Sequence, residues 1–224
     1  MNSIVIFARA PEPGKVKTRL AAQIGDEAAA KLYAAMLQDT ITVAKSAAQE
    51  TKSEVVLCYT PDDAFASGDY SLSKFWHGAN LPQNGNDLGK RMRNATQNRF
   101  ADSAERVVII GSDKPDLEVS ILRCAFEELE NHDLVFGPAI DGGFYLIGTH
   151  APFAESLFAS VIWSDQSTLQ VVLNNARHLN LSVALLPEGS DIDETSDLQN
   201  FISNPELQIK APHFHAALCA ENLI

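Results

Sequence analysis

The sequence predicts a three-layer α/β/α sandwich whose central sheet is mostly parallel, with one antiparallel excursion. Segments of strand character alternate with segments of helical periodicity along the chain. Residues 4–8 form a continuous apolar run, which is typical of a strand buried on both faces. A turn at Gly142 and Gly143 joins two strand segments directly and indicates one antiparallel pair. Alternating strands and helices build βαβ units, whose parallel sheet is covered by helices on both faces.

The first half of the chain divides at its prolines, glycines and helix caps. Two prolines and a glycine break the segment after the first strand, and Asp26 and Asp87 stand where helices can begin. The predicted elements are a strand at 4–8, a loop at 9–15, a helix at 26–49, a strand at 54–59, a loop at 60–74, a short strand at 74–77 and a helix at 87–101.

The second half continues the same alternation and ends in a weakly patterned tail. Apolar side chains at helical spacing mark the helices, and short apolar runs mark the strands. The predicted elements are a strand at 106–110, a loop at 111–116, a helix at 118–130, strands at 133–136 and 144–148, a helix at 165–179, a strand at 181–186, an acidic loop at 191–197 leading into a short helix, and a tail at 205–224 with one helix from Pro212.

Length and composition indicate a single globular domain over residues 1–224. Hydrophobic residues make up 46% and charged residues 21%, and a chain of 224 residues can bury enough surface without a disulfide or metal. No apolar run approaches the length of a membrane span, and residues 4–8 are too short for a signal peptide. The scattered cysteines Cys58, Cys124 and Cys219 fit free thiols, so we expect a cytoplasmic protein.

The charge distribution predicts a local anion site. The net charge of −12 disfavours nucleic acid and anionic membranes as partners. Basic residues nevertheless gather in two short segments. These segments contain Arg9, Lys15, Lys17 and Arg19, and Lys90, Arg91, Arg93 and Arg99. Phosphate is the anion that such segments most often bind, although two solvated basic faces remain an alternative.

The loop after the first strand is the candidate phosphate-binding segment. Ligands of a parallel sheet bind beyond the carboxyl ends of its strands. Pro13 and Gly14 let the backbone approach a ligand, while Lys15, Lys17 and Arg19 can neutralise a diphosphate or triphosphate. The segment lacks the first glycine of a P-loop, so that motif is excluded. The alternative is a surface loop with solvated charges.

Carboxylates follow two other strands and are candidate metal ligands. Asp113 and Asp116 lie in the loop after residues 106–110, and Asp193 lies in the late acidic loop. Carboxylates at strand ends suit a Mg²⁺ or Mn²⁺ that also takes phosphate oxygens. We assign the metal to Asp113 and Asp193. Alternatively, Asp116 caps the next helix, and the late loop is solvated with Ser196 or Asp197 as an N-cap.

Two further segments complete the candidate site. Asp141, Gly142 and Gly143 would let a ligand pack against backbone beside a carboxylate, or form only a hairpin turn. The segment from Gln83 leads through Gly85 into a helix N-terminus, which favours an anion or a nucleobase edge. Arg91 on that helix would reach a phosphate, or is an ordinary exposed residue.

Five ordered motifs together resemble a known family. The segments FARAPEPGKVKTRL, QNGNDLGKRM, IIGSDKPDL, FGPAIDGGFYLIG and DIDETSDL occur in this order over residues 7–198. They resemble the small glycosyltransferases with a nucleotide-diphospho-sugar transferase fold, also called radical-SAM/selenodomain-associated transferases. More distantly, the chain is similar to phospholactate and molybdenum-cofactor guanylyltransferases.

The resemblance implies a Rossmann-like, GT-A-like sandwich that binds a nucleotide in its N-terminal half. By that resemblance, Gly14, Lys17 and Arg19 match a phosphate loop, Asp113 the metal-binding aspartate and Asp193 a late acidic position. Asp141, Gly142 and Gly143 match an acceptor-side turn. Lys114 and Asn86 depart from the family pattern, so Lys114 would weaken a divalent site or contact phosphate instead.

We therefore expect a metal-dependent transferase with a nucleotide-activated donor and an unknown small-molecule acceptor. Glycosyl transfer from a nucleotide-diphospho-sugar is the leading hypothesis, with Asp141 as acceptor-side base and Lys17 and Arg19 on the diphosphate. One alternative is nucleotidyl transfer from a nucleoside triphosphate to a phosphorylated acceptor, with release of pyrophosphate. Another alternative is a nucleotide-binding module without turnover.

Overall fold

The computed structural model describes residues 1–66 and 68–224 and contains a seven-stranded sheet with the order β3-β2-β1-β4-β6-β5-β7. Strand β6 runs antiparallel to β4 and β5, and the other neighbouring pairs are parallel. The strands are β1 Asn2–Arg9, β2 Ser53–Thr60, β3 Asn80–Pro82, β4 Val107–Ile110, β5 Leu134–Pro138, β6 Phe144–Thr149 and β7 Val183–Leu185. The predicted mostly parallel sheet with one antiparallel excursion is confirmed.

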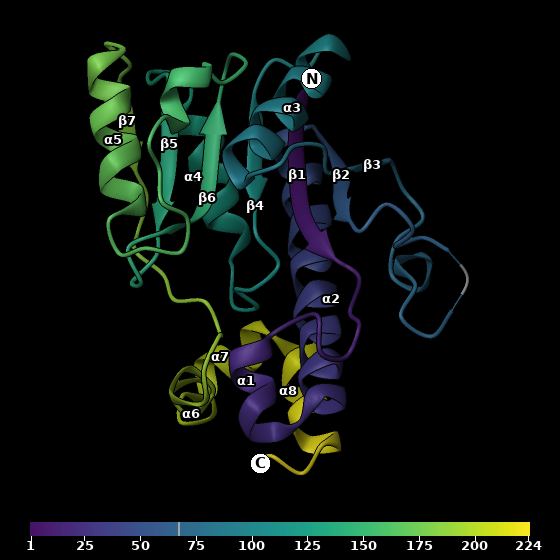
Figure 1. Ribbon diagram of the computed structural model, residues 1–224. Helices are drawn as coiled ribbons and strands as arrows, with labels where there is room; N and C mark the ends of the chain where they lie inside the picture. Colours follow the sequence, from purple (N-terminus) through teal and green to yellow (C-terminus); the bar gives the residue numbers. More distant parts are fainter. Residues whose placement is uncertain (67) are drawn as a thin grey trace.

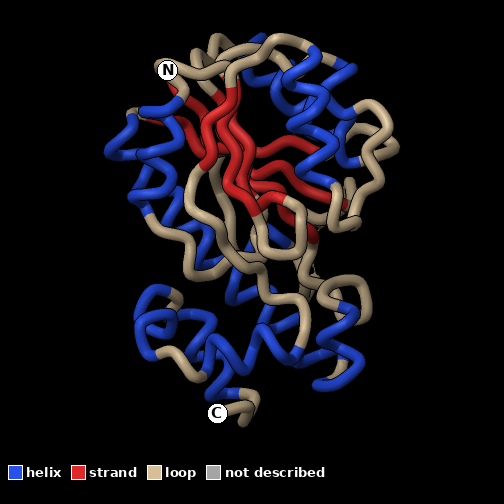
Figure 2. The backbone as a smooth tube through the Cα atoms, turned by 90° about the vertical axis from the view of Figure 1, so that its left-hand side faces the viewer, coloured by secondary structure: helices blue, strands red, loops and turns tan. Residues whose placement is uncertain are grey.

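Helices cover both faces of the sheet, as Figures 1 and 2 show. Ile4 and Ile6 of β1 pack in one hydrophobic cluster with α2 and α4, whereas Val5 points to the other face and packs with α3 and α5. This alternation follows from the two-residue period of a strand. The covering elements are α2 Asp26–Thr51 and α4 Val119–Glu128 on one face, and α3 Leu88–Ala101, α5 Thr168–His178 and the 3-10 helix η2 Glu155–Phe158 on the other.

A third group of helices lies beyond the carboxyl end of β1, in the lower half of Figure 1. Val16 and Leu20 share a hydrophobic cluster there with Phe201 and Phe214 from the end of the chain. The long helix α2 takes part in this cluster and in the sheet-covering cluster, so it joins the two regions. The helices of this group are α1 Thr18–Ile24, α6 Thr195–Ile202, α7 Pro205–Lys210 and α8 Pro212–Ala220.

The predicted strand at 74–77 is wrong. Leu72–Lys74 is a short 3-10 helix, η1, and the edge strand β3 begins only at Asn80. Trp76 ends the preceding turn, since its backbone N–H donates to Leu72, and its indole N–H donates to the carbonyl of Ala79 at 2.8 Å. Its ring is buried in the core. The buried Trp76 in the predicted strand therefore anchors a turn and does not belong to the sheet.

Other differences lie in short helices. Helix α1 covers residues 18–24, where the sequence carries no strong periodic signal, and the tail contains α7 as well as the predicted helix from Pro212. The predicted loop at 60–74 includes residue 67, which lies outside the described residues.

No helix within residues 1–66 and 68–224 combines the length and the apolar composition needed to cross a membrane.

Candidate functional site

The centre of the candidate site is a buried lysine between two carboxylates. Lys17 Nζ lies 2.6 Å from Asp193 Oδ1 and 3.3 Å from Asp113 Oδ1. The Lys17 side chain is 3% exposed, whereas those of Asp113 and Asp193 are 43% and 47% exposed. Burial by itself would lower the pKa of Lys17, but the two carboxylates outweigh that effect and hold its pKa above the usual value. Three segments far apart in sequence thus meet at one point.

The backbone of Lys17 explains why its side chain turns inward. Lys17 is the N-cap of α1 and has a left-handed conformation, with φ of 47°, that non-glycine residues seldom adopt. Val16 before it and Leu20 after it are buried in the helical group. Gly14, with φ of 70°, makes the preceding turn possible. Packing of the flanking apolar residues therefore sets the position of the ammonium group.

Asp193 is held by the start of helix α6. The Asp197 carboxylate accepts hydrogen bonds from the backbone N–H groups of Asp193 and Glu194, at 3.0 and 2.8 Å, and forms a capping box with Glu194. The backbone N–H of Ile192, itself buried, donates to the carbonyl of Asp113 at 3.0 Å. The N-cap is Glu194, so the alternative assignment of Ser196 or Asp197 as the N-cap is wrong: Ser196 is the second residue of the helix, and Asp197 is the third.

Ser112, the residue before Asp113, is anchored by hydroxyl hydrogen bonds that the sequence did not reveal. Ser112 Oγ donates to the carbonyl of Phe7 at 3.1 Å and lies 2.8 Å from the Tyr33 hydroxyl. The Tyr33 hydroxyl also accepts a hydrogen bond from the backbone N–H of Arg9 at 2.8 Å. Burial, followed by the nearby Asp113 charge, raises the pKa of Tyr33 to about 12. Tyr33 therefore stays neutral and ties α2 to the ends of β1 and β4. In the sequence it carries only the signal of a helix core residue.

Asp191 is a further carboxylate that the prediction did not assign. Burial, and after it the Asp113 charge, raise its pKa to about 7, with smaller contributions from Asp193 and Asp141 and an opposing one from Lys17. Within the described residues its carboxylate makes no hydrogen bond or ion pair. The charges of Asp113, Asp193 and Asp141 therefore all act on the Asp191 carboxyl group, as does the Lys17 ammonium.

The donor set suits a metal that shares its coordination with a ligand. The described residues contain no group of three or more His, Cys, Asp or Glu side chains placed to hold an ion. Asp113 and Asp193 nevertheless both contact one cationic atom and are both half-exposed. Mg²⁺ is usually bound by one or two carboxylates together with phosphate oxygens and water. These residues fit that arrangement.

The remaining cations of the phosphate-loop candidate point outward. Arg19 Nη1 lies 3.6 Å from Glu194 Oε1, and the Arg19 side chain is exposed. Lys15 is exposed as well, and its carbonyl accepts a bond from Arg9 at 3.4 Å. Pro13 is half-buried. The structure thus brings Lys17 and Arg19 together with the late acidic loop and leaves Lys15 in solvent.

The turn at Asp141 is both a hairpin and a neighbour of the acidic loop. Asp141 Oδ1 accepts the backbone N–H of Gly143 at 2.9 Å. Gly142 has φ of 88°, and a side chain there would collide with the carbonyl of Gln166. The backbone N–H of Ile140, next to Asp141, donates to the carbonyl of Gly189 at 3.0 Å, so the turn lies beside the segment that leads into the acidic loop.

Gln83 and Arg91 organise the segment before α3. Gln83 Nε2 donates to the carbonyls of Cys58 at 3.0 Å and Ala8 at 3.4 Å, so it lies at the carboxyl ends of β2 and β1. Arg91 Nε donates to the carbonyl of Gly85 at 3.0 Å, and its Nη1 lies 3.4 Å from Gln83 Oε1. Arg91 is half-buried against this loop, so it is not an ordinary exposed helix residue.

The alternative role of Asp116 as a helix cap is wrong. Helix α4 has Glu118 at its N-cap, and the Asp116 carboxylate instead accepts from Lys114 Nζ at 3.0 and 3.1 Å. Lys114 Nζ also lies 5.6 Å from the centre of the Tyr145 ring. The charge next to Asp113 in sequence is therefore neutralised by Asp116.

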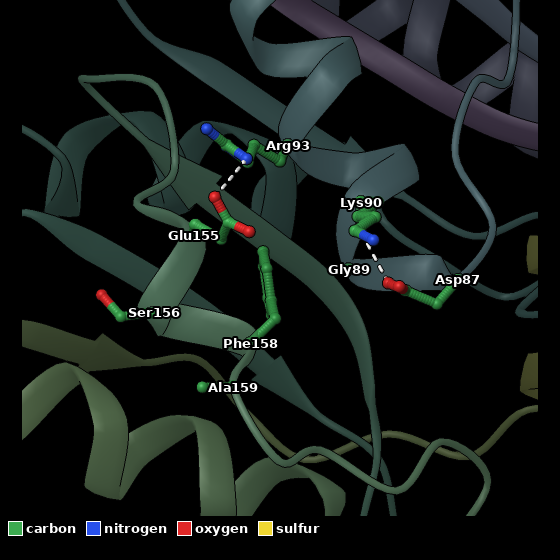
Figure 3. A pocket seen from close by; sticks show the side chains of 8 residues that line it. All are labelled: Asp87, Gly89, Lys90, Arg93, Glu155, Ser156, Phe158 and Ala159. Carbon is green, nitrogen blue, oxygen red and sulfur yellow. Dashed lines mark hydrogen bonds and ion pairs between the residues drawn. The ribbon is translucent and has the colours of Figure 1, made fainter.

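Two surface cavities lie away from these residues. One, of about 510 Å³, lies between α3 and η2, where Arg93 pairs with Glu155 at 3.1 Å (Figure 3). The other, of about 580 Å³, lies beside β7 and α5 and is lined by Leu185 and Arg177 among others. The first cavity is lined by Lys90 and Arg93 of the second basic segment, and neither cavity is lined by Lys17, Asp113 or Asp193. The ion pairs of Lys17 therefore define the candidate site.

Comparisons with known proteins match this architecture. Residues 42–165 match the family model described as "Uncharacterized protein conserved in bacteria (DUF2064)". A crystal structure from Desulfovibrio desulfuricans G20, provisionally described as a nucleotide-diphospho-sugar transferase, is 31% identical with a TM-score of 0.83. The match covers 100% of this chain and 96% of that chain. No curated protein sequence matches.

More distant structures share the fold. A cytidylyltransferase from Leptospira borgpetersenii serovar Hardjo-bovis (strain JB197) is 14% identical with a TM-score of 0.55, over 99% of this chain and 94% of that chain. The manganese complex of Rv0371C from Mycobacterium tuberculosis H37Rv is 15% identical with a TM-score of 0.53, over 91% of this chain and 100% of that chain. The fold expected from the motif resemblance is thereby confirmed.

Proposed function

The chain belongs to the DUF2064 family, and on that premise we propose that it transfers a sugar from a nucleotide-diphospho-sugar to a small-molecule acceptor with the help of Mg²⁺ or Mn²⁺. Its class is that of a nucleotide-utilising transferase, in common with its 31%-identical relative. The free cysteines Cys58, Cys124 and Cys219 support a reducing, cytoplasmic location for this activity.

The observation that carries the proposal is the contact of Lys17 with both Asp113 and Asp193. A basic loop and two carboxylates that converge at the carboxyl ends of strands can bind a metal–diphosphate group together. Arg19 lies beside them at Glu194 and can pair with a phosphate in the two-pronged manner of a guanidinium.

Each segment then has a part in the reaction. The loop at Pro13, Gly14 and Lys15 approaches the diphosphate with its backbone, and Lys17 and Arg19 pair with phosphate oxygens. Asp113 and Asp193 would hold the divalent cation, which supplies positive charge to the leaving diphosphate.

The nucleoside and acceptor sides use other segments. Gln83, Gly85 and Arg91 form the surface for the nucleobase edge, beside the ends of β1 and β2. Asp141 takes the proton of the acceptor hydroxyl, and Gly142 and Gly143 leave room for the acceptor. Asp141 raises the pKa of Asp191 in the acidic loop, which supports an acceptor position at this turn, next to the proposed metal ligands.

Donor turnover tests the proposal. We expect UDP- or GDP-sugars with Mn²⁺ to be hydrolysed or transferred, because the metal neutralises the leaving diphosphate. Asp113→Ala should lower that rate by about 100-fold or more. Asp69→Ala is the matched control, since Asp69 is a highly exposed carboxylate in the loop at 60–74. Absence of turnover together with absence of metal-dependent nucleotide binding would refute the proposal.

Nucleotidyl transfer is a second candidate, favoured by the exposed cations Lys15 and Arg19 that extend the phosphate surface beyond Lys17. Three cations suit a triphosphate as well as a diphosphate. Release of pyrophosphate from GTP or CTP in the presence of phosphorylated acceptors separates this activity from sugar transfer. Nucleotide-dependent thermal stabilisation without turnover in either assay would instead support a binding module.

A further inference from the structure

The Lys17 ammonium lies where a cation bound by both Asp113 and Asp193 would lie. Its nitrogen contacts one oxygen of each carboxylate, at 3.3 and 2.6 Å. A divalent cation bonds to carboxylate oxygens at about 2.0–2.6 Å, so an ion that uses the same two oxygens competes for the same space. Two cations also repel each other strongly at such short range. Lys17 and a metal therefore cannot both occupy the space between these oxygens.

The position of the ammonium is built into the fold. Lys15, two residues earlier, points to solvent, whereas the Lys17 side chain is 3% exposed. The left-handed backbone of Lys17 at the start of α1 and the buried neighbours Val16 and Leu20 direct the side chain inward. The contact of Lys17 with the two carboxylates is therefore a fixed feature of the fold, unlike the contacts of a flexible surface lysine.

The surroundings favour replacement of this ammonium by an ion of higher charge. The carboxylates of Asp113 and Asp193 carry two negative charges, and the Lys17 ammonium between them supplies one positive charge. A single ammonium leaves this group of carboxylates with a net negative charge. A divalent cation would neutralise more of it, provided that the ammonium finds another anionic partner. The diphosphate of the donor is such a partner.

We propose that Lys17 is an internal counter-ion that keeps the metal site closed until a nucleotide diphosphate draws its ammonium away from Asp113 and Asp193. The inference rests on the proposed function. Metal and nucleotide then bind synergistically, and each raises the affinity of the other by the same factor. The metal alone binds weakly, because it must displace a buried ion pair.

Manganese binding without nucleotide tests the closed site. Mn²⁺ affinity is measured by electron paramagnetic resonance for wild type, Lys17→Met and Lys114→Met. We expect Lys17→Met to bind Mn²⁺ about 5- to 100-fold more tightly than wild type. Lys114→Met removes the same charge from the residue next to Asp113, but Lys114 pairs with Asp116. It should change the affinity by less than about threefold.

Two results would overturn the inference at this step. One is a Lys17→Met variant that binds Mn²⁺ no more tightly than wild type. The other is an equal gain in Lys114→Met, which would mean that net charge and not the position of Lys17 decides the affinity. Circular dichroism spectra and melting temperatures of both variants establish that each is folded.

A second measurement uses the wild-type protein. Its Mn²⁺ affinity is compared without nucleotide and with saturating UDP or GDP, after correction for Mn²⁺ bound by free nucleotide. We expect a gain of about 5- to 100-fold in wild type and little gain in Lys17→Met. Equal affinity with and without nucleotide in wild type would contradict the inference.

The two proposals fail separately. Coupled binding of metal and nucleotide without sugar transfer would refute the proposed function and leave the role of Lys17 intact. Sugar transfer by a protein that binds Mn²⁺ independently of Lys17 and of nucleotide would refute the role of Lys17 and leave the proposed function intact.

Discussion

The Asp39 carboxylate on α2 accepts hydrogen bonds from both the backbone N–H and the ring Nδ1 of His213 at the start of α8. The distances to Asp39 Oδ1 are 3.1 and 2.7 Å, and the backbone N–H of Phe214 donates to the other carboxylate oxygen at 2.8 Å. The Asp39 side chain is 1% exposed. One buried carboxylate thus satisfies the first turn of α8 and attaches the end of the chain to α2.

Replacement of Asp39 should therefore loosen the helical group. We expect Asp39→Ala to lower the free energy of unfolding by about 3 kcal/mol, because buried N–H groups lose their partner. Urea denaturation measures the loss. His213→Ala is the matched control, since it removes only a half-exposed ring, and should cost less than about 1 kcal/mol. Equal losses in both variants would contradict the capping role.

Asp197 should act on the proposed metal site through Asp193. Asp197→Ala removes the acceptor for the backbone N–H groups of Asp193 and Glu194. We expect a loss of about 1 kcal/mol of stability and a weakening of metal-dependent nucleotide binding by about tenfold or more. Isothermal titration measures the binding.

The control for Asp197 is Asn204→Ala, which removes the N-cap of α7. A similar stability loss without a change in binding is expected there, because Asn204 does not contact Asp193. If Asn204→Ala weakened binding as much as Asp197→Ala, general destabilisation would explain both effects.

Asp191 should make stability fall as pH rises. Its folded pKa of about 7 lies above an unfolded value of about 3.9, so the folded state retains this proton between about pH 4 and 7. The resulting stability is fully present below about pH 4 and is lost as pH rises through 7. Asp191→Asn, which resembles the protonated form, should be about 4 kcal/mol more stable than wild type at pH 8 and equal to it near pH 4.

The measurement for Asp191 is urea denaturation at several pH values in the presence of a chelator. The chelator is needed because a bound divalent cation would stabilise the charged carboxylate. A constant difference between wild type and Asp191→Asn across this pH range would show that the carboxyl group titrates normally.

Two adjacent glycines should respond differently to the same substitution. Gly142 has φ of 88°, and a Cβ there would meet the backbone carbonyl of Gln166. A Cβ on Gly143 would lie 3.1 Å from the movable Asp141 Oδ1. We expect Gly142→Ala to cost more than about 2 kcal/mol and Gly143→Ala about 1 kcal/mol or less, as measured by thermal and urea denaturation. Similar losses would place the strain elsewhere in the turn.

Much of the fold could be read from local patterns. The strand at 4–8 and the helix at 26–49 correspond to β1 and α2, because apolar periodicity reports directly which side chains face a core. The strand expected at 74–77 failed since Trp76 is buried through a turn and not through a sheet. Helix α1 was missed because seven residues held by tertiary packing need little helical propensity.

The residue types of the candidate site and their places at strand ends could be predicted from the sequence, but the ion pairs between these residues could not. Strand order and the right-handed crossover rule bring such ends to one rim, so Lys17, Asp113 and Asp193 could be grouped in advance. Neither Tyr33 nor Asp191 could be assigned, because a hydroxyl relay and a raised pKa depend on burial and on neighbours from distant segments.

The order of residues along this chain was sufficient to predict a layered α/β architecture, a basic loop after the first strand and late carboxylates, since periodicity and residue chemistry are local properties. Only folding in three dimensions selected the partner of each charge. It paired Lys114 with Asp116 and Lys17 with Asp113 and Asp193. Ion pairs depend on distances of a few ångströms between segments that are remote in sequence, and packing of the helical group against the sheet determines those distances.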